Sequence, residues 1–148
     1  MKHCNILLLT AMTILLQACS GGSDPASESQ AIVPKVYIVS PANGATVTSP
    51  VTIEFGIEGF ALAPAGTFDA NTGHHHLLVD TPLPALDQPI PANSNHLHFG
   101  KAQDATLLEL EPGEHTLQLL LGDGSHTPHA TALISDPIVI TVVAEAVE

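Results

Sequence analysis

Apolar and polar residues alternate over short segments, and this period-two pattern restricts the fold of the chain more than any other feature. In the segment 51–57, the residues on one side are Val51, Ile53, Phe55 and Ile57. A period of two places successive side chains on opposite faces of a β-strand, and no stretch of the chain shows a convincing helical period. The pattern therefore predicts an all-β protein.

Several such segments are separated by turn sequences, for example Pro41–Gly44 and Pro112–Gly113. The expected strands are Lys35–Ser40, Val51–Ile57, Gly73–Asp80, Asn95–Phe99, Thr106–Leu110, Glu114–Leu121 and Ile138–Val143. Short strands with turn signals between them predict an antiparallel β-sandwich of about seven strands, immunoglobulin-like or fibronectin-III-like, with Greek-key connections. The chain has no Trp and no Cys–Trp–Cys framework, so the antibody family itself is not expected.

The N-terminal residues predict an exported lipoprotein. The apolar run Ile6–Leu16 is shorter than the roughly 20 residues that span a bilayer, and is typical of a signal-peptide core. It ends in Leu16-Gln17-Ala18-Cys19, which is similar to a bacterial lipobox, so we expect lipid on Cys19. The expected organisation is a signal peptide (1–18), a lipidated Cys and tether (19–34), a β-sandwich domain (35–144) and a tail (145–148).

The charge balance restricts the partners. Lys and Arg number 3 against 15 Asp and Glu, which gives a formal net charge of −12, and no Arg occurs. A nucleic-acid-binding surface needs clustered cations, so no nucleic-acid partner is expected. In a Gram-negative host, Ser20 after the lipidated Cys directs the chain to the outer membrane, facing the periplasm. The expected partners are then the membrane lipid, a metal ion and an envelope protein.

Histidine is the polar residue that stands out, with 9 in the chain. Two of the expected strands each carry His at i and i+2 on the face opposite their apolar residues. Side chains at this spacing lie about 6.5–7 Å apart, so each pair can converge on one ion. A loop near the C-terminus adds two more. The candidate metal ligands are His74, His76, His96, His98, His126 and His129.

Neutral imidazole is a good ligand for Zn(II), Cu(II) and Ni(II), whereas Cu(I) prefers sulfur. Residues 20–148 contain no Cys and no Met, and the Irving–Williams order places Cu(II) ahead of Zn(II) in affinity. The sequence therefore predicts a site for Cu(II) or Zn(II), with Cu(II) first. A tetrahedral ion takes four ligands, and there are six candidates. Either some of them support the ligands without contacting the ion, or two ions bind.

Some residues are expected to orient the imidazoles by accepting a hydrogen bond from, or packing against, the side of the ring that faces away from the ion, rather than to bind the ion. They are Asp80, Asp104, Asp123 and His115. For His115, and for His75, the alternative is ordinary packing, since both lie on the apolar face of their strands. No cofactor other than the metal is expected.

The favoured hypothesis is metal sequestration or handover without catalysis. Three alternatives remain: a non-enzymatic envelope scaffold with structural His residues, a His cluster that titrates as a pH sensor, and an enzyme that uses bound metal and water. Asp69–Gly73 begins like a calcium loop, D-x-N-x-G, but lacks the terminal Glu, so calcium is not expected. The sequence contains no nucleophile elbow, phosphate loop or zinc-protease motif.

The motif GHHHLLVD at Gly73–Asp80 resembles a bacterial family of small exported proteins, domain of unknown function 4399. Four further pieces match the same pattern: Phe60–Gly66, His98–Gln103, Pro112–Leu119 and the loop from Asp123 to His129. The resemblance extends over Val36–Val142 and departs at Ala102, where the family tends to have Gly. It implies no established activity. The His residues that it places in the family pattern are His76, His98, His115, His126 and His129.

Overall fold

The structure is a computed structural model that describes residues 32–144. The expected signal peptide, the lipidated Cys19, most of the tether and the tail lie outside the described residues. None of the described residues belongs to a helix that is long and apolar enough to cross a membrane. The unit Ala31–Glu148 is compact by itself.

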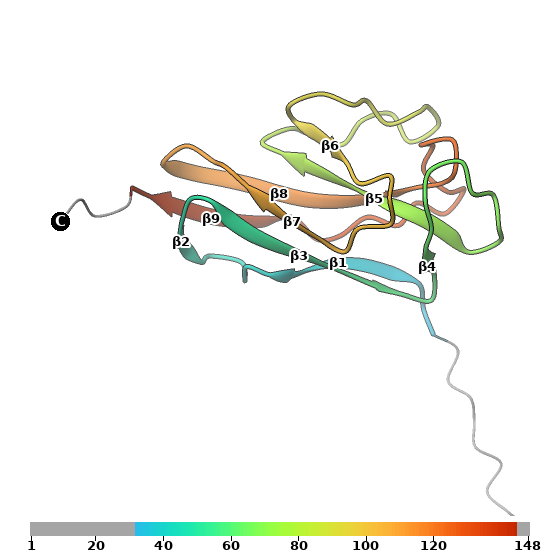
Figure 1. Cartoon of the computed structure of the whole chain (residues 1–148), viewed down its shortest axis with the longest axis horizontal. Coiled ribbons are helices and arrows are strands. Elements are labelled where there is room, and N and C mark those ends of the chain that lie inside the picture. The colour runs from blue at the N-terminus through green and yellow to red at the C-terminus, as the bar shows by residue number, and fades with distance from the viewer. Residues whose placement is uncertain (1–31, 145–148) are drawn as a thin grey trace, which may run out of the picture. The chain divides into compact units, whose positions relative to one another are not determined.

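The all-β prediction is confirmed, because the described residues form strands and no helix (Figure 1). The strands are β1 (Lys35–Ser40), β2 (Thr46–Thr48), β3 (Val51–Glu58), β4 (Ala61–Leu62), β5 (Thr72–Val79), β6 (His96–His98), β7 (Ala105–Leu108), β8 (Gly113–Gly122) and β9 (Ile138–Val143). The expected count of about seven is wrong. β2 and β4 were missed because three and two residues are too short to show an alternating pattern.

The strands form two sheets (Figure 1). The smaller has the order β1-β3-β7 and is antiparallel, and the larger has the order β2-β9-β8-β5-β4, with β6 also paired to β5. Two sheets agree with a sandwich, but this order does not confirm an immunoglobulin-like topology. The pairs β2–β9 and β4–β5 are parallel, which corrects the expectation of a purely antiparallel arrangement.

The main core is formed by apolar side chains of both sheets. Leu77, Leu117, Leu119 and Ile140 of the larger sheet are fully buried, and Ile53 of the smaller sheet packs in the same cluster. Each fully buried side chain of this size contributes about 1.5–3 kcal/mol relative to an exposed one. This core fixes which face of β5 and β8 points inward, and so fixes which residues occupy the other face.

The outer face of β5 and β8 is also buried, which the sequence does not predict. Leu78, Leu120 and Ile90 form a second, smaller cluster there, with Ile134 packed against it. Ile90 belongs to the long connection between β5 and β6, and this connection runs beside β6 over the larger sheet (Figure 1). Seven of the eight residues of β5 are therefore buried, including its three consecutive His.

Ala102 has φ of +61°, in the left-handed region. An L-residue with a Cβ is disfavoured there by roughly 1–2 kcal/mol, and Gly is not. We therefore expect Ala102→Gly to raise the melting temperature by about 4 °C. The control is Ala105→Gly at the exposed first position of β7, which should lower it, because Gly weakens a strand interior. Thermal unfolding of both variants is the measurement, and equal shifts of the two would contradict the argument.

Candidate metal centre

Four imidazole rings meet on the outer face of the larger sheet. His74 and His76 lie on β5, His98 lies on β6, and His126 lies in the loop after β8. The register pairs His76 directly with His98, so the two strands bring their rings together. All six distances between the ring centroids lie between 4.7 and 6.0 Å. We call these four residues the His cluster.

Three members of the cluster satisfy a stricter condition. One ring nitrogen of each of His74, His76 and His98 lies within 4.8 Å of the other two. These three residues could therefore hold a metal ion. His126 completes the group at 4.7 Å from His98 and 5.0 Å from His74, centroid to centroid.

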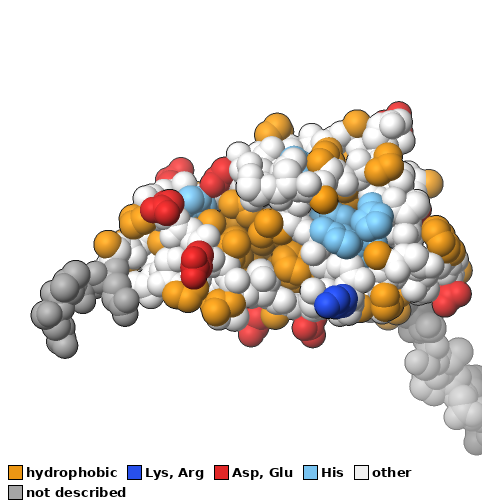
Figure 2. Space-filling view, turned by 45° about the horizontal axis from the view of Figure 1, so that its top comes forward, with side chains coloured by type: hydrophobic (Ala, Val, Ile, Leu, Met, Phe, Trp, Pro, Cys, Tyr) orange, Lys and Arg blue, Asp and Glu red, His pale blue; other side chains and the backbone are white. Residues whose placement is uncertain are grey.

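The cluster has a buried side and an open side. His74 and His76 are 0% and 1% exposed, whereas His98 is exposed and His126 is half-buried. In the space-filling view, His side chains gather in a patch at the surface, with a Lys side chain beside them (Figure 2). An ion or a small ligand would therefore approach past His98 and His126.

The buried rings lack hydrogen-bond partners among the described residues. Both ring nitrogens of His74 and Nδ1 of His76 are buried and have none. A buried polar atom without a partner costs about 1–3 kcal/mol, so each such atom in a folded protein needs an explanation. A bound cation accounts for one nitrogen of each ring, because neutral imidazole gives its single free lone pair to a metal ion while its other nitrogen carries the proton.

Burial also sets the protonation state. Burial, and after it the neighbouring imidazoles of the cluster, lower the pKa of His74 to about 4 and that of His76 to about 3. Burial, together with His126, lowers the pKa of His98 as well. At neutral pH these rings are uncharged, which is the form that ligates metals.

Two glycines make room for the rings. A Cβ on Gly122 of β8 would lie 2.7 Å from Cε1 of His76, and a Cβ on Gly100 would overlap the ring of His98. Gly122 lies opposite His74 in the β5–β8 register, so it forms part of the floor under the cluster. The cluster therefore depends on these two missing side chains as well as on the His residues.

Gly122→Ala should displace the His76 ring and lower metal affinity about 10-fold or more, as loss of support behind a ligand commonly does. Gly100→Ala is the matched comparison. Its Cβ meets the exposed His98, which can move aside, so its effect should be smaller. Zn(II) titration of both variants tests this order, and a larger loss for Gly100→Ala would contradict it.

The loop that carries His126 is fixed by Asp123. One carboxylate oxygen, Oδ1, accepts hydrogen bonds from the Ser125 N–H (2.8 Å), the Ser125 hydroxyl (2.7 Å) and the Thr127 N–H (3.0 Å). Burial raises the pKa of Asp123, but these hydrogen bonds outweigh it and hold the pKa below its usual value. The His126 N–H also donates to the Asp123 carbonyl at 2.9 Å. Asp123 thus supports the position of a cluster residue, as the sequence predicts in outline.

Neighbouring loops hold this turn against the sheet. The Gly66 N–H donates to the Gly124 carbonyl at 2.8 Å, and the Ile90 N–H donates to the His126 carbonyl at 2.8 Å. The Ala65 N–H donates to the Gly100 carbonyl at 3.0 Å. The loop between β4 and β5, the connection before β6 and the loop after β8 therefore meet at one end of β5 (Figure 1).

The structure does not bring His96 and His129 into the cluster. His96 is opposite Leu78 in the register, and its Nδ1 donates to Oδ1 of Asn93 at 3.1 Å. The ring of His129 packs edge-on against Phe60, with centroids 5.0 Å apart. The six expected ligands thus separate into four that meet and two that contact other residues.

Asp80 and His115 lie together, away from the cluster. Nδ1 of His115 donates to Asp80 at 2.6 Å, and Nε2 donates to the Glu111 carbonyl at 2.8 Å. Asp80 follows β5 at the end opposite to His74, where the Thr116 N–H donates to it at 2.7 Å. This pair therefore ties a strand end together and does not touch the cluster.

The hydrogen bond from His115 to Asp80 raises the pKa of His115. The folded state then favours the protonated ring, so its contribution to stability is complete below about pH 6.5 and is lost as pH rises through the raised pKa. We expect His115→Gln to destabilise the protein more at pH 5.5 than at pH 8.5. Denaturant unfolding at the two pH values measures this. An equal loss at both would contradict a charged His115, and Asp80→Asn should bring the pKa of His115 back toward its ordinary value.

His75 lies on the inner face of β5, as the alternating pattern predicts. Its ring packs against Phe55, with centroids 5.2 Å apart, and both ring nitrogens are buried without a partner in the described part of the chain. Burial lowers its pKa to about 4, although the charge of Asp104 opposes the shift. Asp104 is therefore near His75 and not placed behind the cluster.

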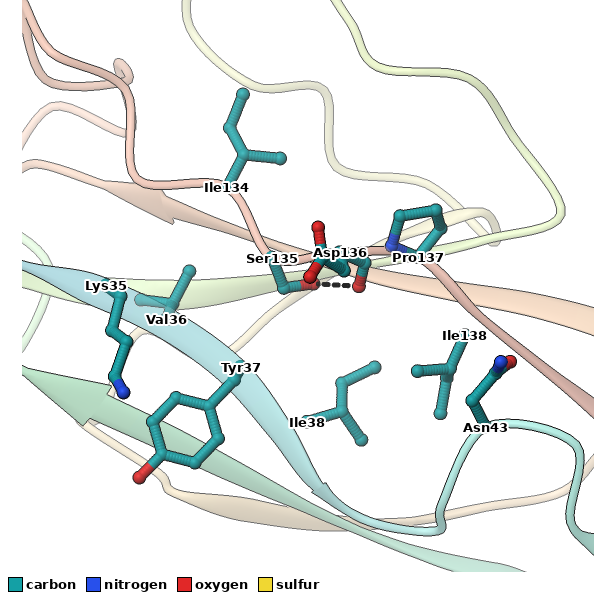
Figure 3. Close-up of a pocket in the computed structure, with 10 residues that line it drawn as sticks. All are labelled: Lys35, Val36, Tyr37, Ile38, Asn43, Ile134, Ser135, Asp136, Pro137 and Ile138. Carbon is teal, nitrogen blue, oxygen red and sulfur yellow. Dashed lines mark hydrogen bonds between the residues drawn. The ribbon is translucent and has the colours of Figure 1, made fainter.

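A groove of about 520 Å³ lies elsewhere, between β1 and the segment before β9 (Figure 3). Two of its polar groups have partners: the Ser135 hydroxyl donates to the Asp136 carbonyl at 2.8 Å, and the Lys35 ammonium lies 3.1 Å from Glu58. Its lining contains no His and one carboxylate, that of Asp136. The groove therefore lacks the several converging ligands that the His cluster has.

Sequence reasoning missed the glycines of the site. Gly100 ends the sequence HFG, which begins with the cluster residue His98. Gly122 ends the sequence LLLG on β8 and is opposite His74. A Gly at the end of a strand can indicate close approach of another group, but it is also a turn residue. Only the close approach of the rings in the structure distinguishes the two meanings.

Comparison with known proteins gives a family and no function. The family whose sequence profile matches residues 53–143 is described as a domain of unknown function, DUF4399. No curated protein matches the chain, and no solved structure matches it. The matched range contains all four residues of the His cluster and covers more than half of the chain. The chain therefore belongs to the DUF4399 family of domains of unknown function.

Proposed function

We propose that the His cluster binds one divalent transition-metal ion and that the protein sequesters or hands over this ion. The observation that carries the proposal is the meeting of four imidazole rings, with centroids 4.7–6.0 Å apart, two of them fully buried. Both ring nitrogens of His74 and Nδ1 of His76 have no hydrogen-bond partner among the described residues. His75 also has buried nitrogens without a partner, but its ring packs against Phe55 on the inner face, so it is the convergence of several rings that distinguishes the cluster.

The ring spacing fits a tetrahedral ion. Zn–N bonds of about 2.0–2.1 Å place the centroids of four tetrahedral imidazoles about 5 Å apart. The observed centroid distances of 4.7–6.0 Å surround that value. The longest, 6.0 Å, joins His76 and His126, and His126 lies outside the group whose ring nitrogens are within 4.8 Å of one another, so binding by all four residues requires the His126 ring to move inward.

This geometry changes the preferred metal. Affinity alone favours Cu(II), but Cu(II) prefers square-planar or tetragonal surroundings, whereas Zn(II) accepts a tetrahedron readily. The six centroid distances span only 4.7–6.0 Å, whereas the two diagonals of a square are about 1.4 times its edges, so the spacing supports a tetrahedron and Zn(II) ahead of Cu(II). Four protein ligands fill a tetrahedral ion, which supports storage or transfer rather than catalysis.

The proposal includes the location of the protein. Residues 16–20, with the lipobox-like sequence before Cys19, support an envelope lipoprotein whose domain is held on the periplasmic side of the outer membrane by a lipid anchor. In that location the metal-binding domain would meet ions and envelope proteins directly. The strongly acidic composition, with a net charge of −12, favours accumulation of cations near the domain.

The test is elemental analysis of the chain without residues 1–19, purified from the periplasm without chelator, followed by calorimetric titration of the metal-free form. This form retains every described residue. The expected result is about one equivalent of metal and a sub-micromolar dissociation constant for Zn(II). Such a constant corresponds to a binding free energy stronger than about −8 kcal/mol. Absence of metal with only weak binding would overturn the proposal in favour of an envelope scaffold.

A further inference from the structure

The four cluster residues are not held equally. His74, His76 and His98 lie on strands whose backbones are hydrogen-bonded in the larger sheet. His126 lies in the loop after β8, outside any strand. The three strand residues also form the group in which ring nitrogens lie within 4.8 Å of one another, and that group does not include His126.

We propose that His126 is the exchangeable ligand of the centre: an incoming imidazole replaces it while His74, His76 and His98 keep the ion. This proposal rests on the proposed metal-binding function and specifies how the ion leaves the site. The exchange is a ligand substitution in which one neutral nitrogen lone pair leaves the metal and another takes its place. No electron or proton transfer is required.

Burial explains why the exchange would occur at His126. Movement of His74 or His76 away from the ion would push a fully buried ring against the floor of the site, where Gly122 leaves no spare space. His126 is half-buried on the open side of the cluster, so a rotation of its side chain brings the ring into water. The His98 ring is exposed and can shift as well, but its backbone is paired with that of His76, and its ring nitrogen belongs to the group within 4.8 Å of one another, to which His126 does not belong.

The backbone of His126 provides a second argument. Its φ is +67°, a conformation that costs most L-residues roughly 1–2 kcal/mol, although His tolerates it better than many. Asp123, Gly66 and Ile90 maintain this conformation through the loop hydrogen bonds. The hydrogen bonds hold the backbone of the loop and none of them uses the His126 ring, so ring exchange by rotation of the side chain does not require the loop to unfold.

The geometry of the remaining ligands supports a stable intermediate. Three His ligands with an open fourth position are the donor set of well-known zinc sites, so His74, His76 and His98 suffice to hold an ion. The ring nitrogens of these three residues lie within 4.8 Å of one another without any contribution from His126, so the set that remains after its loss is already assembled. The natural acceptor is a His side chain of a metal-receiving protein, and free imidazole is its simplest equivalent.

The test uses Co(II), whose visible spectrum reports coordination, with the wild-type chain without residues 1–19 and the variant His126→Gly. Gly accepts the positive φ at this position, so the variant removes the ligand without straining the loop. His129→Ala is the control, since His129 contacts Phe60 and not the cluster. The readouts are Co(II) affinity, the spectrum with and without free imidazole, and the rate at which a chelator removes the ion.

The expected result is that His126→Gly binds Co(II) about 10–100-fold more weakly, releases it at least about 10-fold faster, and regains the wild-type spectrum with millimolar imidazole. The control should behave as wild type. Wild-type affinity and an imidazole-insensitive spectrum in His126→Gly would overturn the inference, as would complete loss of binding that imidazole does not restore. If the wild-type chain itself binds no Co(II) and no Zn(II), the proposed function fails, and this inference fails with it.

Discussion

Replacement of His76 by Gln is expected to lower the affinity for Zn(II) at least about 100-fold, because loss of support behind a ligand already costs 10–100-fold. His76 is 1% exposed, and its ring lies within 5.2 Å of the rings of both His74 and His98, centroid to centroid. No other described His is opposite His98 in the strand register. Calorimetric titration of the metal-free variant measures the change.

The matched control is His129→Gln, which removes an imidazole of the same loop region without touching the cluster. Its ring packs against Phe60, so Zn(II) affinity should remain within about 2-fold of wild type, as expected for a distant and independent site. Both variants should keep the circular dichroism of a β-protein. Similar losses in the two variants would mean that the His residues bind ions unspecifically rather than as one centre.

Acidification is expected to unfold the metal-free protein between pH 6.5 and pH 4. Three buried rings carry this effect, since burial lowers the pKa of His74 and of His75 to about 4 and that of His76 to about 3. In the unfolded chain these groups protonate near pH 6.5, so the unfolded state binds more protons below that value. Stability is therefore complete above about pH 6.5 and falls as the pH decreases toward the folded pKa values.

The size of the effect is large compared with the stability of a small domain. Each group contributes a slope of up to about 1.4 kcal/mol per pH unit, so the three together contribute about 4 kcal/mol per pH unit. From pH 6.5 to pH 5 the three groups together remove about 6 kcal/mol, and a domain of this size is stable by about 5–15 kcal/mol, so a stability near the lower end of this range gives a midpoint near pH 5. Circular dichroism and intrinsic Tyr fluorescence during acid titration give the midpoint.

Two changes should alter the acid unfolding in different ways: Zn(II), which acts at the cluster, and a substitution of His75, which acts on the inner face of β5. Zn(II) at about 100 times its dissociation constant adds about 2.7 kcal/mol, so the midpoint should move about half a pH unit lower. His75→Leu removes a titrating ring from the inner face of β5 without removing a cluster residue, so it should reduce the slope by about a third and leave Zn(II) affinity unchanged. A free energy of unfolding that stays constant between pH 6.5 and pH 4.5 would contradict the burial of neutral rings.

The strands were predictable from local pattern where they are long enough to have one. The segment Lys35–Ser40 matches β1 at both ends, and Ile138–Val143 matches β9, because runs of β-branched residues between turn signals specify a strand locally. β2 and β4 were not predictable, since each exists only through its pairing with a distant strand. Thr46 pairs with Thr141, which no local pattern encodes.

The candidate site was predictable in composition and only partly in membership. Alternation along 73–80 placed His74 and His76 on one side and His75 on the other, which the packing of His75 against Phe55 agrees with. Alternation also places His96 and His98 on the same face of their strand, so it cannot tell which of them joins the cluster. The register distinguishes them, because His98 is opposite His76 and His96 is opposite Leu78.

The sequence by itself determined the all-β class, the division of β5 into two faces and the supply of imidazoles without competing sulfur ligands, since these depend on residue type and on a period of two. The tertiary structure alone decided which imidazoles meet. It brings the loop residue His126 to β5 and β6, separates the Asp80–His115 pair from the cluster, and covers the outer face of the sheet with the connection that contains Ile90. The physical reason is that a metal site depends on distances of a few ångströms between residues far apart in the chain, and those distances are set by strand register and loop packing.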